Sequence, residues 1–190
     1  MKNKYEICKG SIADIMQQEN VSLAESFLTC DCIILFDVSG SMNSTDGMWI
    51  SRFERGIKEL KDLQATLPGR VALVQFADHP DFLPGGVPTT AYGGTDLTAA
   101  LRYIKIADEI PDMRIIVISD GEPNNELTAL AEASRFQNRI DTIYIGPETE
   151  SLGRDFLSQL ASRSGGKPIQ SAAENISQDV TLLLAERAGA

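Results

Sequence analysis

Short apolar runs alternate with amphipathic segments along most of the chain. Runs over 32–36, 71–77 and 113–119 are strand-length and are bounded by turn-forming residues, which is typical of buried strands. Shorter apolar stretches predict further strands over 140–145 and 168–170. The pattern therefore predicts five strands spread along the sequence.

Segments with a helical period separate these strands. Leu97, Ala100, Leu101 and Ile104, for example, recur at the spacing of one helix face. The proline- and glycine-rich stretch 78–94 predicts a long loop that holds a short edge strand near Phe82. The predicted helices cover residues 12–27, 49–67, 96–107, 125–138, 152–163 and 176–186.

This alternation predicts an α/β fold. We expect a Rossmann-like, doubly wound, mainly parallel central sheet with helices on both faces and one short antiparallel edge strand. With 190 residues, 43% of them hydrophobic, the chain is the size of one domain. We place that domain at residues 30–186, after a helical N-terminal extension (1–29) and before a short C-terminal tail (187–190).

Charge and cysteine content restrict the function classes. A net charge of −10, with Lys and Arg dispersed, argues against a nucleic-acid partner. The longest apolar runs are too short to cross a membrane, and no export signal is evident, so neither secretion nor a membrane is expected. Three cysteines cannot all pair within the chain, and Cys30 and Cys32 are too close to bridge comfortably. A reducing, cytoplasmic location is the prediction.

Oxygen-bearing side chains fall where several predicted segments meet. Asp37 closes the first strand, Thr95 ends the long loop before a helix, and Asp120 closes the third strong strand. Ligands of such sheets bind at the carboxyl ends of strands, where the direction of the connections reverses. Three segments that are distant in sequence are therefore expected to converge at one edge.

The residue types at this edge suit a hard cation. Asp37, Ser39 and Ser41 alternate along a tight loop, in which Gly40 allows a sharp turn. Mg²⁺ prefers oxygen ligands, whereas Zn²⁺ favours Cys and His. Mg²⁺ is the expected ion, with Mn²⁺ or Ca²⁺ as alternatives.

Three motifs resemble those of a known family. Asp37-Val38-Ser39-Gly40-Ser41, Gly93-Gly94-Thr95-Asp96 and Ile118-Ser119-Asp120-Gly121-Glu122-Pro123 look like the three parts of the metal-ion-dependent adhesion site of von Willebrand factor type A (VWA) domains. The resemblance covers roughly residues 31–186, and short intracellular bacterial members, including those of tellurite-resistance-like operons, are closest in layout. The N-terminal extension departs from the family pattern.

The resemblance implies a metal-dependent binding module. Ser39, Ser41 and Thr95 would coordinate the ion directly or through water, while Asp37 and Asp120 would hold waters or ligate it. A protein partner would supply an Asp or Glu to the metal. The alternative is a structural or scaffold component, of a phage particle or a bacterial stress-response complex, in which the metal only stabilises loops. The resemblance also suggests that the closing helix, 176–186, slides when ligand binds.

Some of these residues also have simpler interpretations. Thr95 can cap the following helix, a role compatible with metal binding. The lone His79 is expected at the surface without a role, and the Cys30-Asp31-Cys32 cysteines as buried packing residues. Met48 and Trp49 lie just past the metal loop, either as an apolar contact beside the ion or as packing of the first long helix. Glu122, Asn124 and Asn125 are expected to rim the same face.

Enzyme schemes fit the sequence poorly. A haloacid-dehalogenase-like phosphatase needs a second carboxylate two residues after Asp37, where Ser39 stands. A serine hydrolase needs Gly-x-Ser-x-Gly and a later His, but Asp37 and Ser41 replace the glycines and His79 precedes Asp120. A metal-activated water lacks a histidine-rich ligand set. We therefore expect a protein that is not an enzyme.

Overall fold

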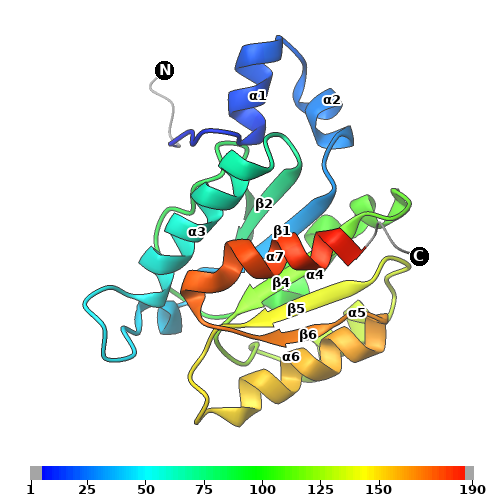
Figure 1. Cartoon of the computed structure of the whole chain (residues 1–190). Helices are drawn as coiled ribbons and strands as arrows, with labels where there is room; N and C mark the ends of the chain where they lie inside the picture. The colour runs from blue at the N-terminus through cyan, green and yellow to red at the C-terminus, as the bar shows by residue number, and fades with distance from the viewer. Residues whose placement is uncertain (1–5, 187–190) are drawn as a thin grey trace.

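The computed structural model describes residues 6–186 (Figure 1). Residues 1–5 of the predicted extension and the predicted tail, 187–190, lie outside the described residues. The strands are β1 (Cys32–Asp37), β2 (Val71–Phe76), β3 (Pro80–Phe82), β4 (Arg114–Ser119), β5 (Ile140–Tyr144) and β6 (Pro168–Gln170). The α-helices are α1 (Ile12–Glu19), α2 (Leu23–Leu28), α3 (Arg52–Thr66), α4 (Leu97–Ile104), α5 (Glu126–Ala133), α6 (Ser151–Ser164) and α7 (Ile176–Ala185), with 3₁₀ turns η1 (Gly40–Asn43), η2 (Lys105–Glu109) and η3 (Ala173–Asn175).

The strands form one six-stranded sheet in the order β3-β2-β1-β4-β5-β6. All neighbours are parallel except β3, which runs antiparallel to β2 at one edge. Both edge strands are three residues long and begin with a proline, Pro80 in β3 and Pro168 in β6. The predicted fold class is confirmed, including the short antiparallel edge strand near Phe82.

Helices cover both faces of the sheet because its central strands are apolar on both sides. Alternate residues of β1 divide between two cores: Ile33 and Leu35 pack with α4, α5 and α6, whereas Ile34 and Phe36 pack with α3 and α7. All six residues of β1 are buried. The strands that carry the candidate site are therefore fixed from both sides.

Three predicted helices differ from the structure at their ends. The helix predicted over 49–67 begins only at Arg52, where Ser51 caps it, so Met48 and Trp49 lie in an exposed loop and do not pack the helix. The helix predicted over 125–138 is α5, which ends at Ala133. The helix predicted over 96–107 continues as the 3₁₀ turn η2 after Ile104.

The N-terminal segment folds as two helices where the sequence predicted one. Asn20 ends α1 in the left-handed conformation (φ 54°), and Ser22 begins α2 with a capping box. The backbone of this segment forms hydrogen bonds with loops at the amino ends of the parallel strands. Cys8 N donates to Gly85 O (3.0 Å), and Gly69 N donates to Gly10 O (2.9 Å). Figure 1 shows α1 and α2 at the far end of the molecule from the loop that precedes α3.

Two further observations concern the cysteines and the helices. Cys8, Cys30 and Cys32 are buried free thiols, which agrees with the expectation for the Cys30-Asp31-Cys32 pair. Within residues 6–186, no helix combines the length and the apolar character that crossing a membrane requires.

Candidate metal centre

The two candidate carboxylates meet at the carboxyl edge of the sheet. Asp37 is the last residue of β1, and Asp120 follows the last residue of β4, the parallel neighbour of β1. The chain leaves β1 toward β2 on one side and returns to β4 on the other, so this edge is the switch point of the sheet. Asp37 and Asp120 are both buried, with exposed fractions of 0% and 1%.

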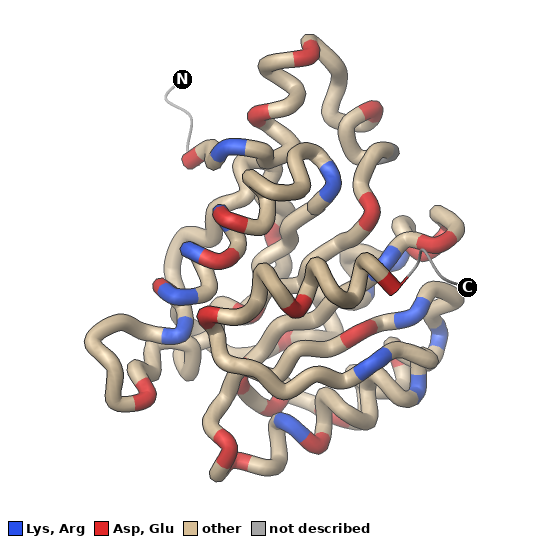
Figure 2. Tube along the Cα trace, viewed as in Figure 1, with Lys and Arg blue, Asp and Glu red and all other residues tan. Residues whose placement is uncertain are grey.

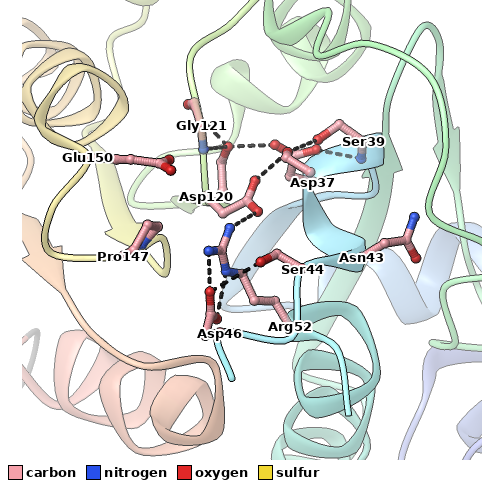
Figure 3. A network of polar contacts seen from close by, with 12 residues as sticks. Asp37, Ser39, Asn43, Ser44, Asp46, Arg52, Asp120, Gly121, Pro147 and Glu150 are labelled. Atoms are coloured by element: carbon pink, nitrogen blue, oxygen red, sulfur yellow. Dashed lines mark hydrogen bonds and ion pairs between the residues drawn. The ribbon is translucent and has the colours of Figure 1, made fainter. Parts of the chain in front are cut away.

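Hydroxyl groups connect the two carboxylates. Ser41 Oγ donates to Asp120 Oδ1 (2.7 Å) and lies 2.9 Å from Ser39 Oγ. Ser119 Oγ donates to Asp37 Oδ2 (2.5 Å), and Ser39 N donates to Asp37 Oδ1 (2.7 Å). Figure 3 shows the Asp37 and Asp120 side chains side by side, with Ser39 next to Asp37. Ser39 is buried while Ser41 is exposed, so the cluster opens to solvent on the Ser41 side.

Backbone hydrogen bonds bring the loop of Thr95 to the same place. Gly40 N donates to Gly93 O (3.1 Å), and Tyr92 N donates to Val38 O (2.8 Å). Two hydrogen bonds connect Thr95 with Asn124. Thr95 N donates to Asn124 Oδ1 (2.8 Å), and Asn124 N donates to Thr95 O (2.9 Å). Thr95 is buried, and its hydroxyl has no hydrogen-bond partner within residues 6–186. Capping of α4 falls to Asp96, whose Oδ1 accepts from Ala99 N.

The other residues expected near this edge are also placed. Glu122, Asn124 and Asn125 are exposed between β4 and α5, and Asn124 bonds Thr95 as described above. Asn125 caps α5 through Thr128 N. His79 is exposed, as expected for a surface histidine. The structure thus brings all five predicted metal-site residues to one edge, four through side-chain hydrogen bonds and Thr95 through its loop.

Burial makes ionisation of the Asp37 carboxyl group unfavourable. It raises the pKa of Asp37 to about 7; the nearby charge of Asp120 adds to the rise, and hydrogen bonds from Ser119 and Ser39 oppose it. A cation at this position would stabilise the ionised form. Asp37 therefore provides an electrostatic reason for the site to hold a metal ion.

A buried arginine, which the sequence analysis missed, completes the cluster. Arg52 Nη1 donates to Asp120 Oδ2 (2.6 Å), and Arg52 also forms a bidentate pair with Asp46, with Nε 2.8 Å from Asp46 Oδ2 (Figure 3). Arg55 binds the same Asp46 (2.8 Å) and reaches Glu174 in η3 (2.7 Å). The position of Arg52 at the start of α3 could have indicated this ion pair from the sequence, because a cation in the first turn of a helix opposes the helix dipole and needs an acidic partner.

The capping box before Arg52 sets where α3 begins. Ser51 Oγ accepts from Glu54 N (3.2 Å), and the Glu54 carboxylate accepts from Ser51 N (2.9 Å). We expect Ser51→Ala to cost about 1 kcal/mol of stability, lowering Tm by roughly 2–4 °C. Mg²⁺ affinity, measured by calorimetry, should stay unchanged because Arg52 is also held by Asp46 and Asp120. Ser22→Ala, which removes the capping box of α2, is the matched control; a drop in Mg²⁺ affinity in the Ser51 variant alone would contradict this expectation.

The donor set fits a hard divalent cation. Two carboxylates and three hydroxyls supply only oxygen, in keeping with Mg²⁺ or Mn²⁺. Within the described residues, no group of three or more His, Cys, Asp or Glu side chains is arranged to hold a metal ion. Binding of a metal at this edge would thus depend on Ser39, Ser41 and Thr95 as well as the carboxylates.

Comparisons with solved structures identify the fold. BatB from Bacteroides thetaiotaomicron superposes with a TM-score of 0.60 at 18% identity, covering 84% of this chain and 98% of that chain. A von Willebrand factor type A structure from Catenulispora acidiphila gives 0.62 at 17% identity, covering 83% of this chain and 42% of that chain. Manganese-loaded TRAP protein of Plasmodium vivax gives 0.56 at 16% identity, covering 83% and 74%.

These likenesses define the architecture at two levels. The chain is a doubly wound α/β protein, and within that class it has the von Willebrand factor type A fold. Neither a protein-family model nor a curated protein sequence matches the chain. The resemblance inferred from the three motifs is thereby confirmed for the fold.

Proposed function

We propose that this protein is a metal-dependent protein-interaction module. Asp37, Ser39, Ser41, Thr95 and Asp120 would hold one divalent cation, Mg²⁺ or its close substitute Mn²⁺, at the carboxyl edge of the sheet. An acidic side chain of a partner protein would complete the coordination of the metal. When bound, the ion supplies an electrophilic centre for that carboxylate.

The meeting of five oxygen donors at one edge carries this proposal. Asp37 and Asp120 are both buried there beside the Ser39 and Ser41 hydroxyls, and the loop of Thr95 is bonded to the same edge. With Asp37, Asp46 and Asp120 ionised and Arg52 charged, these groups sum to two negative charges, which one divalent cation would neutralise. Because Ser39, Ser41 and Thr95 are neutral donors, the ion would remain electrophilic enough to bind an external carboxylate.

The comparisons support the proposal at a coarser level. The manganese-loaded state of the Plasmodium TRAP protein is an instance of this fold with a divalent metal. The structure of the Mfa5 tip protein of type V pili from Porphyromonas gingivalis, with 13% identity and a TM-score of 0.59, is described as a vWF domain. We further propose that the protein is not an enzyme, and that it works in a reducing, cytoplasmic setting, in keeping with its three buried free thiols.

One observation favours a second candidate, a scaffold in which the metal only stabilises loops. Since burial raises the pKa of Asp37, a bound cation would stabilise the fold whether or not a partner binds. The two candidates differ in what the metal is needed for. An interaction module needs it for partner capture, whereas a scaffold needs it for stability alone.

The test combines ion binding with partner capture. Calorimetry with Mg²⁺ and Mn²⁺ alone should detect one binding site, which Asp37→Ala and Thr95→Ala weaken at least tenfold, on the order of 1.4 kcal/mol or more. A partner captured from lysate in Mg²⁺ should be lost in EDTA and with both variants, although both variants remain folded. An Asp→Asn or Glu→Gln scan of that partner should then reveal one acidic residue on which capture depends.

Other results would decide against the proposal. Capture that persists in EDTA, together with a large loss of stability, would favour the scaffold. Absence of any ion binding by the wild-type chain would remove both candidates. His79→Ala, which changes an exposed residue outside the site, is the control and should leave ion binding unchanged.

A further inference from the structure

Large apolar side chains are exposed around the candidate metal centre. Among the side chains that the structure describes (residues 6–27 and 29–186), ten such residues are exposed, and six of them lie in loops or first helical turns at the carboxyl edge of the sheet. Outside this edge, exposed apolar residues lie on α2, α4, η2 and α7. We call the six the apolar ring; they are Met48, Trp49, Ile50, Tyr92, Leu127 and Leu152.

The ring residues come from four separate segments. Three lie in the loop before α3, Tyr92 in the loop before Thr95, Leu127 in the first turn of α5, and Leu152 in the first turn of α6. In a parallel sheet, these segments all lie at the edge where the strands end. An exposed apolar surface of this kind marks an interaction site more often than an isolated apolar residue does.

Trp49 is fully exposed, yet the loop that carries it is held in shape. Asp46 at the base of the loop binds both Arg52 and Arg55. The backbone adds two closures, Met48 N to Thr45 O (2.8 Å) and Arg52 N to Ser44 O (2.9 Å). Figure 1 shows this loop projecting from the body of the molecule beside the start of α3. An ordered loop that presents a tryptophan to solvent is already arranged for binding, which lowers the entropic cost of association.

Acidic residues surround the ring. Glu122 and Glu126 lie between β4 and α5, and Glu148 and Glu150 lie between β5 and α6; all four are exposed. The arginines of the centre, Arg52 and Arg55, are buried in ion pairs. Figure 2 shows Lys and Arg scattered over the chain without a cluster at this edge. Arg154 in the first turn of α6 is partly exposed and pairs with Asp155, so the four glutamates outnumber it and the exposed charge of this face is negative.

We propose that the apolar ring is the docking surface for the partner's segment, and that Trp49 is its anchor. This inference rests on the proposed function and specifies the partner. The acidic residue of the partner's segment would be flanked by apolar side chains that cover the ring. Lys or Arg residues of the segment would lie further out, opposite the four glutamates. A pocket on the partner would receive the Trp49 ring, since buried tryptophans are frequent hot spots of interfaces.

The charges favour a protein partner over two other occupants. An anionic membrane surface would be repelled by the acidic rim. A second copy of the chain would bring two acidic rims together on a protein whose net charge is −10. A protein segment with basic flanks avoids both penalties.

The chain offers a built-in probe, because Trp49 is its only tryptophan. The full chain would be used to select a displayed random-peptide library in Mg²⁺, and the recovered peptides would be synthesised and titrated while Trp49 emission is followed. We expect peptides with an Asp or Glu between apolar residues, a blue shift of the emission on binding, and reduced quenching by acrylamide. Trp49→Ala lacks this fluorophore, so wild type and the variant are also compared by calorimetry, where the variant should bind the peptides at least about thirtyfold more weakly. Ile106→Ala, which removes an exposed apolar residue of η2, is the matched control and should bind normally.

The other outcomes separate this inference from the proposed function. If acidic peptides bind only in Mg²⁺ but bind the Trp49→Ala variant equally well, the docking surface is wrong and the function stands. If no peptide depends on Mg²⁺ and calorimetry detects no ion, the function fails and the inference fails with it. A blue shift with vesicles of phosphatidylcholine and phosphatidylglycerol in EDTA would assign the ring to lipid. A dimer by sedimentation that protects Trp49 from acrylamide would assign it to self-association.

Discussion

Asp37→Asn is expected to make the protein more stable than wild type in EDTA at pH 8, while abolishing its response to Mg²⁺. The substituted amide keeps the size of the side chain and can accept from Ser39 N, but it carries no buried charge. The difference between the ordinary pKa of 3.8 and about 7 corresponds to roughly 4 kcal/mol, an upper bound on the gain in metal-free protein. Tm measured with and without Mg²⁺ tests both expectations together.

The pH dependence of Asp37 ionisation determines that the Asn substitution stabilises the metal-free protein. In wild type, the folded state holds its proton on Asp37 up to about pH 7, whereas the unfolded state loses it near 3.8. The contribution of Asp37 to stability is therefore fully present below pH 3.8 and is lost as pH rises to about 7. Relative to Asp37→Asn, metal-free wild type should weaken steadily across that window and then level off.

Urea unfolding of both proteins in EDTA, between pH 4 and 8, measures this difference. Asp62→Asn, which neutralises an exposed carboxylate of α3, is the control and should follow the pH dependence of wild type. If wild type and Asp37→Asn keep a constant difference across the window, burial does not penalise Asp37. If Mg²⁺ stabilises Asp37→Asn as much as wild type, Asp37 is not part of the metal centre.

Arg52→Gln is expected to have opposite effects on stability and on metal affinity. Without metal, the buried Asp120 loses its cation and Asp46 loses a bidentate partner, which should cost about 3–5 kcal/mol. With Arg52 gone, a divalent ion would meet two uncompensated carboxylates. Mg²⁺ should then bind more tightly, by roughly tenfold, while partner capture weakens because the two carboxylates offset the charge of the ion more fully.

Two further variants separate the effect of the Arg52 charge from the effect of its geometry and of the neighbouring ion pairs. Arg52→Lys keeps the charge but loses the planar fork, so its Mg²⁺ affinity should stay close to wild type even if its stability falls. Arg55→Gln breaks the pairs with Asp46 and Glu174 without touching Asp120, so it should lose stability with Mg²⁺ affinity unchanged. A weaker Mg²⁺ affinity in Arg52→Gln would show that Arg52 only positions Asp120 and does not offset its charge.

Local sequence signals predicted the fold well because they coincide with burial. The central strands are apolar on both faces, so each appears as a continuous apolar run, and β6 was predicted to the residue. The start of α3 was misplaced because Met48, Trp49 and Ile50 look like the apolar beginning of a helix. Their exposure results from the turn through Asp46 and Gly47, both at positive φ, and from the Ser51 cap.

The candidate site was predicted in part for a similar reason. Asp37 and Asp120 end strands, and topology alone places strand ends together. The pairing of Arg52 with Asp120 joins residues 68 positions apart and depends on how α3 sits against the strand ends, which no local pattern encodes. The same holds for Ser119, whose hydroxyl reaches Asp37 across the adjacent strands β1 and β4.

The two borders of the sheet restrict how this protein can recognise anything. Pro80 and Pro168 open the edge strands without an N–H to donate, and each strand offers only three residues for pairing. The edge strands therefore offer few backbone N–H and C=O groups with which an extended peptide could pair as a seventh strand. The same shortage disfavours edge-to-edge association of neighbouring molecules into a fibril. Under the proposed function, specificity would come from side chains held at the ends of the strands, where changes in the loops would alter the partner without altering the sheet beneath.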